Sequence, residues 1–225
     1  MVLPSPPVNA DIRSQLRALP SLAGPFPPFD PDSAPANPVV LFTEWLRSAI
    51  DAGVPEPHAT TLSTVDGDGR PSARVLIIKN VDGRGWQFAS SATSTKGREL
   101  AATPWAALTF YWPALGRQVR VRGDVSRADA QESAADFRNR SLGSRIVGLL
   151  GRQSERLDSR PDLDVAIERA TERITLDPEL VPADWSVYTV HPREVEFWQG
   201  DRQRRHVRLR YLRSGDEWRR ELLWP

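Results

Sequence analysis

In the middle of the chain the pattern of hydrophobic and polar positions changes to short runs of β-forming residues, which predict β-strands; over residues 118–125 apolar and polar side chains take opposite faces. The apolar runs there are short and are separated by Asp/Gly turns, in the segments TVDGDGRP and NVDGRGW. Such runs between turn residues are typical of an antiparallel meander. The predicted strands cover residues 59–65, 72–79, 86–90, 106–112 and 118–125.

Helical spacing appears on both sides of this region. Asn37 can cap a helix that has Pro38 in its first turn, an apolar face at Val39, Phe42, Leu46 and Ile50, and an end at Gly53. Ser94 can cap a second helix over residues 94–102. Three more helices are predicted at residues 129–139, 141–150 and 163–174, and four more strands at 185–190, 194–198, 205–210 and 217–222.

These elements predict one mainly β, α+β domain over residues 38–225, built on an antiparallel β-barrel that helices flank. Residues 1–37 are rich in proline, which fixes φ and removes hydrogen-bond donors. They predict an extended arm with one short helix near residues 11–19.

Composition narrows the function classes. Of the 225 residues, 40% are hydrophobic and 26% are charged, as in an ordinary globular protein. The net charge of +1 gives no strong field to attract nucleic acid. The absence of cysteine excludes disulfides, thiol nucleophiles and zinc-thiolate sites, and the three histidines have no ligand spacing, so no metal is expected. With no apolar run of about 20 residues and no signal peptide, we expect a cytoplasmic protein without membrane contact.

Two segments offer candidate anion sites. Residues 90–97 bring hydroxyls, backbone N–H groups and Lys96 to the start of a predicted helix, where an anion is favoured. The alternative is that these hydroxyls only cap the helix. Arg74 and Lys79 stand at the two ends of an apolar strand, and their offset of five sends them to opposite faces. They reach one ligand only if the strand bends, and otherwise they are charged ends of a core strand.

The stretch at residues 196–211, EFWQGDRQRRHVRLRY, is the most densely basic part of the chain. If the part after the Gly turn is a strand, Arg204, His206 and Arg208 share one face. That face can hold an anion, because arginine forks grip phosphate and histidine titrates near neutral pH. A solvated edge strand, on which arginines discourage aggregation, is the alternative.

No dinucleotide-binding, P-loop or GxSxG pattern is present. Instead, seven segments in order resemble the pyridoxamine 5′-phosphate oxidase family over about residues 38–225. They are ARVLIIK (73–79), STKGREL (94–100), FYWPALGRQVRVRG (110–123), RQSE (152–155), EFWQG (196–200), RRHVRLRY (204–211) and WRRELLWP (218–225). The resemblance implies an FMN-binding split β-barrel that forms a homodimer with FMN at the subunit interface.

Residue roles also follow from the resemblance. It implies cofactor binding by Arg74, Lys79, Ser90, Thr95, Lys96, Gln118, Gln153, Ser154, Trp198 and Arg208. It implies substrate binding by Lys79, Arg140, Ser144, Arg204 and His206, of which Arg204 and His206 lie over the substrate ring as the catalytic pair. The implied reaction is FMN-dependent oxidation of pyridoxine or pyridoxamine 5′-phosphate to pyridoxal 5′-phosphate with O2 as the electron acceptor.

The sequence departs from the family pattern mainly at the substrate end. Asp136 stands where the family has a phosphate-contacting tyrosine, and Thr95 replaces an arginine that contacts the FMN phosphate. Ala89 replaces a tyrosine, Val207 replaces an aspartate, and the arm lacks an arginine and a tyrosine found in some members. Two alternatives therefore stay open: an FMN oxidase of another heteroaromatic substrate, like the related phenazine-precursor oxidases, and a flavin-binding protein without turnover.

Overall fold

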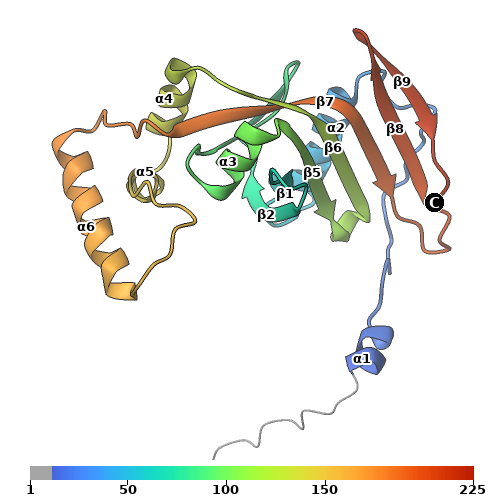
Figure 1. Ribbon diagram of the computed structural model, residues 1–225. Helices are drawn as coiled ribbons and strands as arrows, with labels where there is room; N and C mark the ends of the chain where they lie inside the picture. The colour runs from blue at the N-terminus through green and yellow to red at the C-terminus, as the bar shows by residue number, and fades with distance from the viewer. Residues whose placement is uncertain (1–11) are drawn as a thin grey trace, which may run out of the picture.

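A single curled antiparallel sheet of nine strands forms the centre of the protein, in a computed structural model that describes residues 12–225 (Figure 1). The strand order is β2-β1-β5-β6-β7-β4-β3, with β8 paired to β7 and β9 to β8. The strands are β1 (Ala59–Val65), β2 (Pro71–Ile77), β3 (Asn80–Asp82), β4 (Gly85–Ser91), β5 (Trp105–Trp112), β6 (Arg117–Arg127), β7 (Trp185–Gln199), β8 (Val207–Ser214) and β9 (Glu217–Leu222). The predicted antiparallel split β-barrel with flanking helices is confirmed, and its sheet has the form of a curled half-barrel.

Six α-helices and one 3-10 turn accompany the sheet in the described part of the chain. They are α1 (Ile12–Ala18), α2 (Pro38–Asp51), α3 (Thr95–Ala102), η1 (Pro113–Leu115), α4 (Ala130–Arg138), α5 (Leu142–Leu149) and α6 (Arg160–Leu176). The predicted caps are present: the side chains of Asn37 and Ser94 accept hydrogen bonds from backbone N–H groups at 2.9 and 3.2 Å. The structure adds Asp129 as the cap of α4, at 2.8 Å.

Helix α2 packs on the sheet through aromatic residues. Phe42 is fully buried and meets the rings of Trp86 and Phe110 edge-on, at 5.2 and 4.8 Å between centroids. The predicted face is wrong at Ile50, which is 56% exposed. Leu41 and Trp45 are buried in its place, because they continue the stripe of Phe42 at helical spacing.

Strand β7 is one 15-residue strand, where the sequence predicts two. Its first half pairs with β4 and its second half with β8, while β6 runs beside both halves. Pro192, which suggests a break, lies opposite a register shift at Gly123. A Cβ at Gly123 would stand 1.8 Å from the carbonyl oxygen of His191, so this close backbone approach requires glycine. The continuous strand connects the α4 and α6 side of the molecule to β8 and β9 (Figure 1).

Helices α4, α5 and α6 enclose a second, smaller apolar cluster beyond the end of the sheet (Figure 1), formed by Phe137, Leu149, Ala170 and Ile174. Helix α6 begins three residues earlier than predicted. The Ser159 side chain caps it by accepting from the Asp162 N–H at 3.3 Å, and proline fills its first turn.

The amino-terminal arm lies against strand β8 and helix α2. The Tyr211 hydroxyl donates to the Pro35 carbonyl at 2.7 Å, and the ring of Phe29 meets Trp45 edge-on at 5.0 Å. The predicted short helix is confirmed as α1, although the first eleven residues of the arm fall outside the described residues. The boundary between arm and domain at residue 38 stays a prediction. Among residues 12–225, no helix is both long and apolar enough to cross a membrane.

Candidate active site

The first turn of α3 places a buried ammonium group beside hydroxyls. Lys96 is 8% exposed, and its Nζ donates to Ser90 Oγ at 3.0 Å and to Ser94 Oγ at 3.4 Å. Within residues 12–225 it forms no ion pair with a carboxylate. Burial lowers the pKa of Lys96; the Arg74 charge lowers it further, and Glu99 opposes the change. A buried cation with only hydroxyl partners has room for an anionic ligand.

Arg74 of β2 faces the same space. Its guanidinium contacts Thr64 and Ser72 and lies 3.1 Å from the carboxylate of Glu99, which is almost fully buried. The Thr64 hydroxyl donates to the same Glu99 oxygen at 2.5 Å. Glu99 therefore fixes the position of Arg74 from α3. Glu99 gives no signal in the sequence, because nothing local relates residues 25 positions apart.

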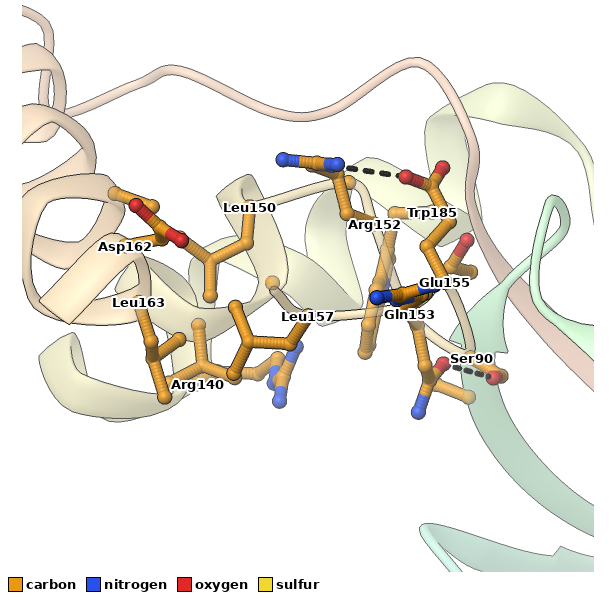
Figure 2. A pocket seen from close by; sticks show the side chains of 17 residues that line it. Ser90, Arg140, Leu150, Arg152, Gln153, Glu155, Leu157, Asp162, Leu163 and Trp185 are labelled. Atoms are coloured by element: carbon orange, nitrogen blue, oxygen red, sulfur yellow. Dashed lines mark hydrogen bonds and ion pairs between the residues drawn. The ribbon is translucent and has the colours of Figure 1, made fainter. Parts of the chain in front are cut away.

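A cavity of about 500 Å³, here named the α3 cavity, connects these groups. The Ser90 hydroxyl also donates to Gln153 Oε1 at 3.3 Å, which brings the loop before α6 to the cavity (Figure 2). The structure thus brings together six of the residues predicted to bind the cofactor. The lining consists of Ser72, Arg74, Val75, Leu76, Ala89, Ser90, Thr95, Lys96, Gln153 and Ser154.

The composition of the α3 cavity suits a phosphate monoester. Arg74 supplies a planar fork, Lys96 a compact charge and the serines neutral donors, while Thr95 and Lys96 bring backbone N–H groups at a helix start. In the part of the chain that the structure describes, Glu99 is the one carboxylate that pairs with either of the two cations. The residues present fit a ligand that ends in a phosphate.

A second cavity of about 400 Å³ opens next to the first between β4 and the helices, and is here named the α5–α6 cavity. Ala89, Ser90 and Gln153 line both. Its other walls are largely apolar, with Leu150, Leu157 and Leu163 among them, and Arg140 and Trp185 also line it (Figure 2). Figure 2 shows Asp162 and Leu163 on the side of this cavity away from Ser90.

Three other predicted cofactor residues form a row across the sheet. Gln118 of β6 is the register partner of Trp198 of β7, which is the partner of Arg208 of β8. Directly cross-strand partners point to the same face. Arg208 Nε donates to Glu196 Oε1 at 2.8 Å, and Nη1 donates to the Trp224 carbonyl at 2.9 Å. The row therefore presents the amide of Gln118, the indole of Trp198 and the guanidinium of Arg208, whose position Glu196 and the Trp224 carbonyl fix.

This row and the α3 cavity lie at opposite ends of β7. Ser90 is the register partner of Ser186, and Trp198 follows twelve residues later on the same strand. At about 3.3 Å per residue this is roughly 40 Å of strand. A single ligand that touches both sets must therefore take them from two chains.

The expected strand face at Arg204, His206 and Arg208 is wrong in part. Strand β8 begins only at Val207, and Arg204 lies in the preceding loop with φ of 65°. The Arg204 guanidinium donates to Ser21 Oγ at 3.0 Å. His206 accepts a hydrogen bond from the Asp201 N–H at Nδ1, 3.0 Å, and its ring lies 4.9 Å from that of Trp198. The loop, and not strand alternation, brings His206 to the row.

Two of the predicted substrate residues, Lys79 and Arg140, lie near Asp136, whereas His206 lies beside Trp198 in the row. Lys79 Nζ lies 3.3 Å from Asp136 Oδ1, and Trp185 Nε1 donates to Asp136 Oδ2 at 2.9 Å. The Arg140 guanidinium stacks on Trp185, 4.0 Å from the ring centroid. Burial lowers the pKa of Arg140, and Asp136 opposes this. Ser144 accepts from the Ser141 hydroxyl at 2.9 Å.

Lys79 does not line the α3 cavity, so its expected cofactor role stays a prediction. Trp185 and Asp136 meet across 49 residues, and the tryptophan gave no signal of its own in the sequence. The described residues hold no group of three or more His, Asp or Glu side chains that could bind a metal ion.

Comparison with known proteins agrees with this geometry. Residues 46–174 match the family described as pyridoxamine 5′-phosphate oxidase, and residues 185–225 match the pyridoxine 5′-phosphate oxidase C-terminal dimerisation region. A pyridoxine/pyridoxamine 5′-phosphate oxidase of Paraburkholderia phytofirmans is 46% identical over 191 residues, which cover 84% of this chain and 89% of that protein.

Two solved structures share the fold. PhzG from Burkholderia lata, in complex with tetrahydrophenazine-1-carboxylic acid, has a TM-score of 0.83 and 34% identity, covering 92% of this chain and all of that one. A pyridoxamine 5′-phosphate oxidase-related, FMN-binding protein from Nostoc punctiforme has a TM-score of 0.63 and 21% identity, covering 87% of this chain and all of that one. The second likeness concerns the fold alone.

Proposed function

Because this chain belongs to the pyridoxamine 5′-phosphate oxidase family and is an FMN-dependent oxidoreductase, we propose that it oxidises pyridoxine or pyridoxamine 5′-phosphate to pyridoxal 5′-phosphate with O2 as the electron acceptor. The observation that carries the proposal is the α3 cavity, where the buried ammonium of Lys96 and the partly buried guanidinium of Arg74 face hydroxyl groups. Among residues 12–225, Glu99 is the one carboxylate that pairs with either cation.

We assign the FMN phosphate and ribityl chain to Arg74, Ser90, Thr95, Lys96, Gln153 and Ser154. When bound, FMN supplies hydride acceptance from the C4′ carbon of the substrate and electron transfer to O2. The residues of this chain supply charge, orientation and exclusion of water. Glu99 holds Arg74 in place before the ligand arrives, so little side-chain ordering remains to be done on binding.

We propose a homodimer in which the row of Gln118, Trp198 and Arg208 from one chain completes the α3 cavity of the other. The match of residues 185–225 to a dimerisation region supports this, since that region contains β7, β8 and β9. The roughly 40 Å of strand between the two sets in one chain supports it as well. Each dimer then has two equivalent sites.

His206 and Arg204 are the proposed catalytic pair. Because His206 Nδ1 accepts from the Asp201 N–H, the neutral ring carries its proton on Nε2. Nε2 is thereby a donor toward the oxygen or nitrogen on the C4′ carbon. Arg204 has no carboxylate partner among the described residues, so it can turn from Ser21 toward the substrate. Lys79, Arg140 and Ser144 are assigned to the substrate phosphate.

The experiment is anaerobic reduction of the FMN-loaded protein. Addition of pyridoxine 5′-phosphate or pyridoxamine 5′-phosphate should bleach the flavin absorbance, and admission of O2 should restore it with formation of pyridoxal 5′-phosphate. Failure of both compounds to bleach the flavin overturns the proposed substrates. The visible spectrum recorded beforehand establishes that FMN is bound, so failed loading and failed turnover are separated.

A second candidate substrate is another heteroaromatic compound, such as a reduced phenazine carboxylic acid. Two observations favour it. The chain is similar to PhzG over 92% of its length, and Lys79, which is assigned to the substrate phosphate, is already paired with Asp136. The same bleaching assay with a reduced phenazine carboxylic acid tests it. Faster bleaching than with either vitamer phosphate would reverse the order of the two candidates.

A further inference from the structure

Asp136 forms an ion pair with Lys79, which the proposed function assigns to the substrate phosphate. Its Oδ1 lies 3.3 Å from Lys79 Nζ, and its Oδ2 accepts from Trp185 Nε1 at 2.9 Å. The Asp136 side chain is 17% exposed and that of Lys79 is 31% exposed. Both carboxylate oxygens are used, so Asp136 is fixed in the subsite and cannot simply turn into solvent.

Arg140 is the other cation of this subsite, and it is not paired in the same way. Its Nη1 is buried and has no hydrogen-bond partner among the described residues. Its guanidinium rests on Trp185, and it lines the α5–α6 cavity beside Ser90. A Cβ at Gly148 would come within 3.0 Å of Arg140 Nη1, so the glycine leaves room for this placement. An unsatisfied buried donor at a cavity wall is open to an anionic ligand.

The charges of the three residues leave the subsite with a single net positive charge. A phosphate monoester carries between one and a half and two negative charges near pH 7. The phosphate would be attracted by Lys79 and Arg140 but repelled by Asp136, which stays beside Lys79. A neutral group, or one with a single charge, loses less to this repulsion. The Lys79–Asp136 pair therefore discriminates between ligands by their charge and not by their shape.

We propose that Asp136 is a specificity-determining residue, which lowers the preference of the enzyme for phosphorylated over unphosphorylated substrates by competing for Lys79. This inference rests on the proposed function, because it takes the assigned phosphate subsite as given. We therefore expect the preference for phosphorylated substrates to increase when the Asp136 carboxylate is replaced by a neutral group.

The test compares Asp136→Asn with the wild type in the FMN-loaded enzyme at constant ionic strength. Asparagine keeps the shape and an oxygen for Trp185 but removes the charge. The ligands are 4-deoxypyridoxine 5′-phosphate and 4-deoxypyridoxine, which lack the group to be oxidised, and their dissociation constants are followed through tryptophan fluorescence. We expect about tenfold tighter binding of the phosphate ligand and a change of less than about twofold for the other.

Glu132→Gln is the matched control. Glu132 lies on the same helix and pairs with Arg84 at 3.2 Å, outside both cavities, and its neutralisation should change neither constant. A double variant, Lys79→Met with Asp136→Asn, should lose most of the gain, because Lys79 is then absent.

Three results would overturn the inference: no gain for the phosphate ligand in Asp136→Asn, an equal gain for both ligands, or a gain that survives removal of Lys79. An equal gain would mean that Asp136 acts through the placement of Trp185. Flavin bleaching by the vitamer phosphates is measured separately. A protein that fails to bleach but shows the tenfold shift would contradict the proposed reaction and leave the role of Asp136 standing.

Discussion

Lys96 Nζ donates to Ser90 Oγ at 3.0 Å, inside a cavity where the ammonium group has no carboxylate partner among the described residues. The ammonium group of Lys96 can therefore pair with the phosphate of the cofactor when FMN binds. It is costly in the empty protein, because a buried charge without a counter-charge loses its hydration. This relationship yields two predictions.

The first concerns Lys96→Met. We expect FMN affinity to fall about 30- to 160-fold, since a charge-assisted contact to a buried phosphate contributes about 2–3 kcal/mol. Riboflavin, which has no phosphate, should bind equally well to variant and wild type. Fluorescence titration of both flavins measures this. Arg98→Met on the same helix is the control, because Arg98 is exposed. Equal losses for FMN and riboflavin would contradict a phosphate contact.

The second prediction concerns pH. Burial lowers the pKa of Lys96 below the ordinary lysine value of about 10.4. Between the lowered pKa and that value the unfolded chain binds more protons than the folded apoprotein, so the contribution of Lys96 to apoprotein stability rises with pH. FMN affinity should fall over the same interval, because the ammonium loses its charge.

Lys96→Arg isolates this effect, since arginine stays charged throughout the interval. Urea denaturation of the apoprotein and FMN titration at several pH values between 7 and about 10 measure the two trends. If the wild type and Lys96→Arg show the same pH dependence of FMN affinity, another group is responsible.

The third prediction concerns Glu196, which is 4% exposed and contacts Arg208 at 2.8 Å and Arg120 at 3.2 Å. In Glu196→Gln the two arginines lose their shared counter-charge. We expect the free energy of unfolding to fall by about 1–2 kcal/mol, which is less than for a fully buried pair because both arginines are partly exposed. FMN affinity should also fall, since Arg208 is no longer held. Glu221→Gln, in the more exposed pair with Arg210, should cost less; the reverse order in urea denaturation would contradict this account.

The fourth prediction concerns the loop that carries His206. The Asp201 carboxylate accepts from the N–H groups of Gln203 and Arg205 at 2.8 and 3.1 Å, and the Asp201 N–H donates to His206. Asp201→Ala should loosen the loop and lower the rate of anaerobic flavin reduction about tenfold or more, with FMN affinity unchanged. Insertion of one residue between Gly200 and Arg204 should act in the same direction. If FMN affinity falls as much as the rate, the loop is part of the cofactor site.

The fifth prediction concerns the core under α2. Phe42→Ala removes a fully buried ring that meets Trp86 and Phe110 and should cost about 3–5 kcal/mol of unfolding free energy. Val40→Ala on the same helix, where Val40 is 45% exposed, should cost less than about 0.5 kcal/mol. Chemical denaturation of both variants measures the difference, and similar costs would mean that α2 does not pack as described.

The sequence by itself determined the elements whose causes are local. The caps at Asn37 and Ser94 and the bounds of β1 and β9 depend on residues within a few positions, so period and capping predict them. The presence of Lys96 at a helix start also followed from spacing alone. The remaining candidate residues were identified from the resemblance to the family, because their spacing in the sequence does not show that they belong to one site.

Only the tertiary structure decided which charges meet. Lys79 pairs with Asp136 across 57 residues and Arg74 with Glu99 across 25, and such pairs depend on strand register and helix packing. The continuity of β7 was equally hidden, because the register shift at Gly123, opposite which Pro192 lies, leaves no local signal in the sequence. The same holds for Arg204: its neighbours suggested a strand, but the Asp201 turn keeps it in a loop. Local chemistry sets the elements, while long-range packing sets the charge that each site presents to a ligand.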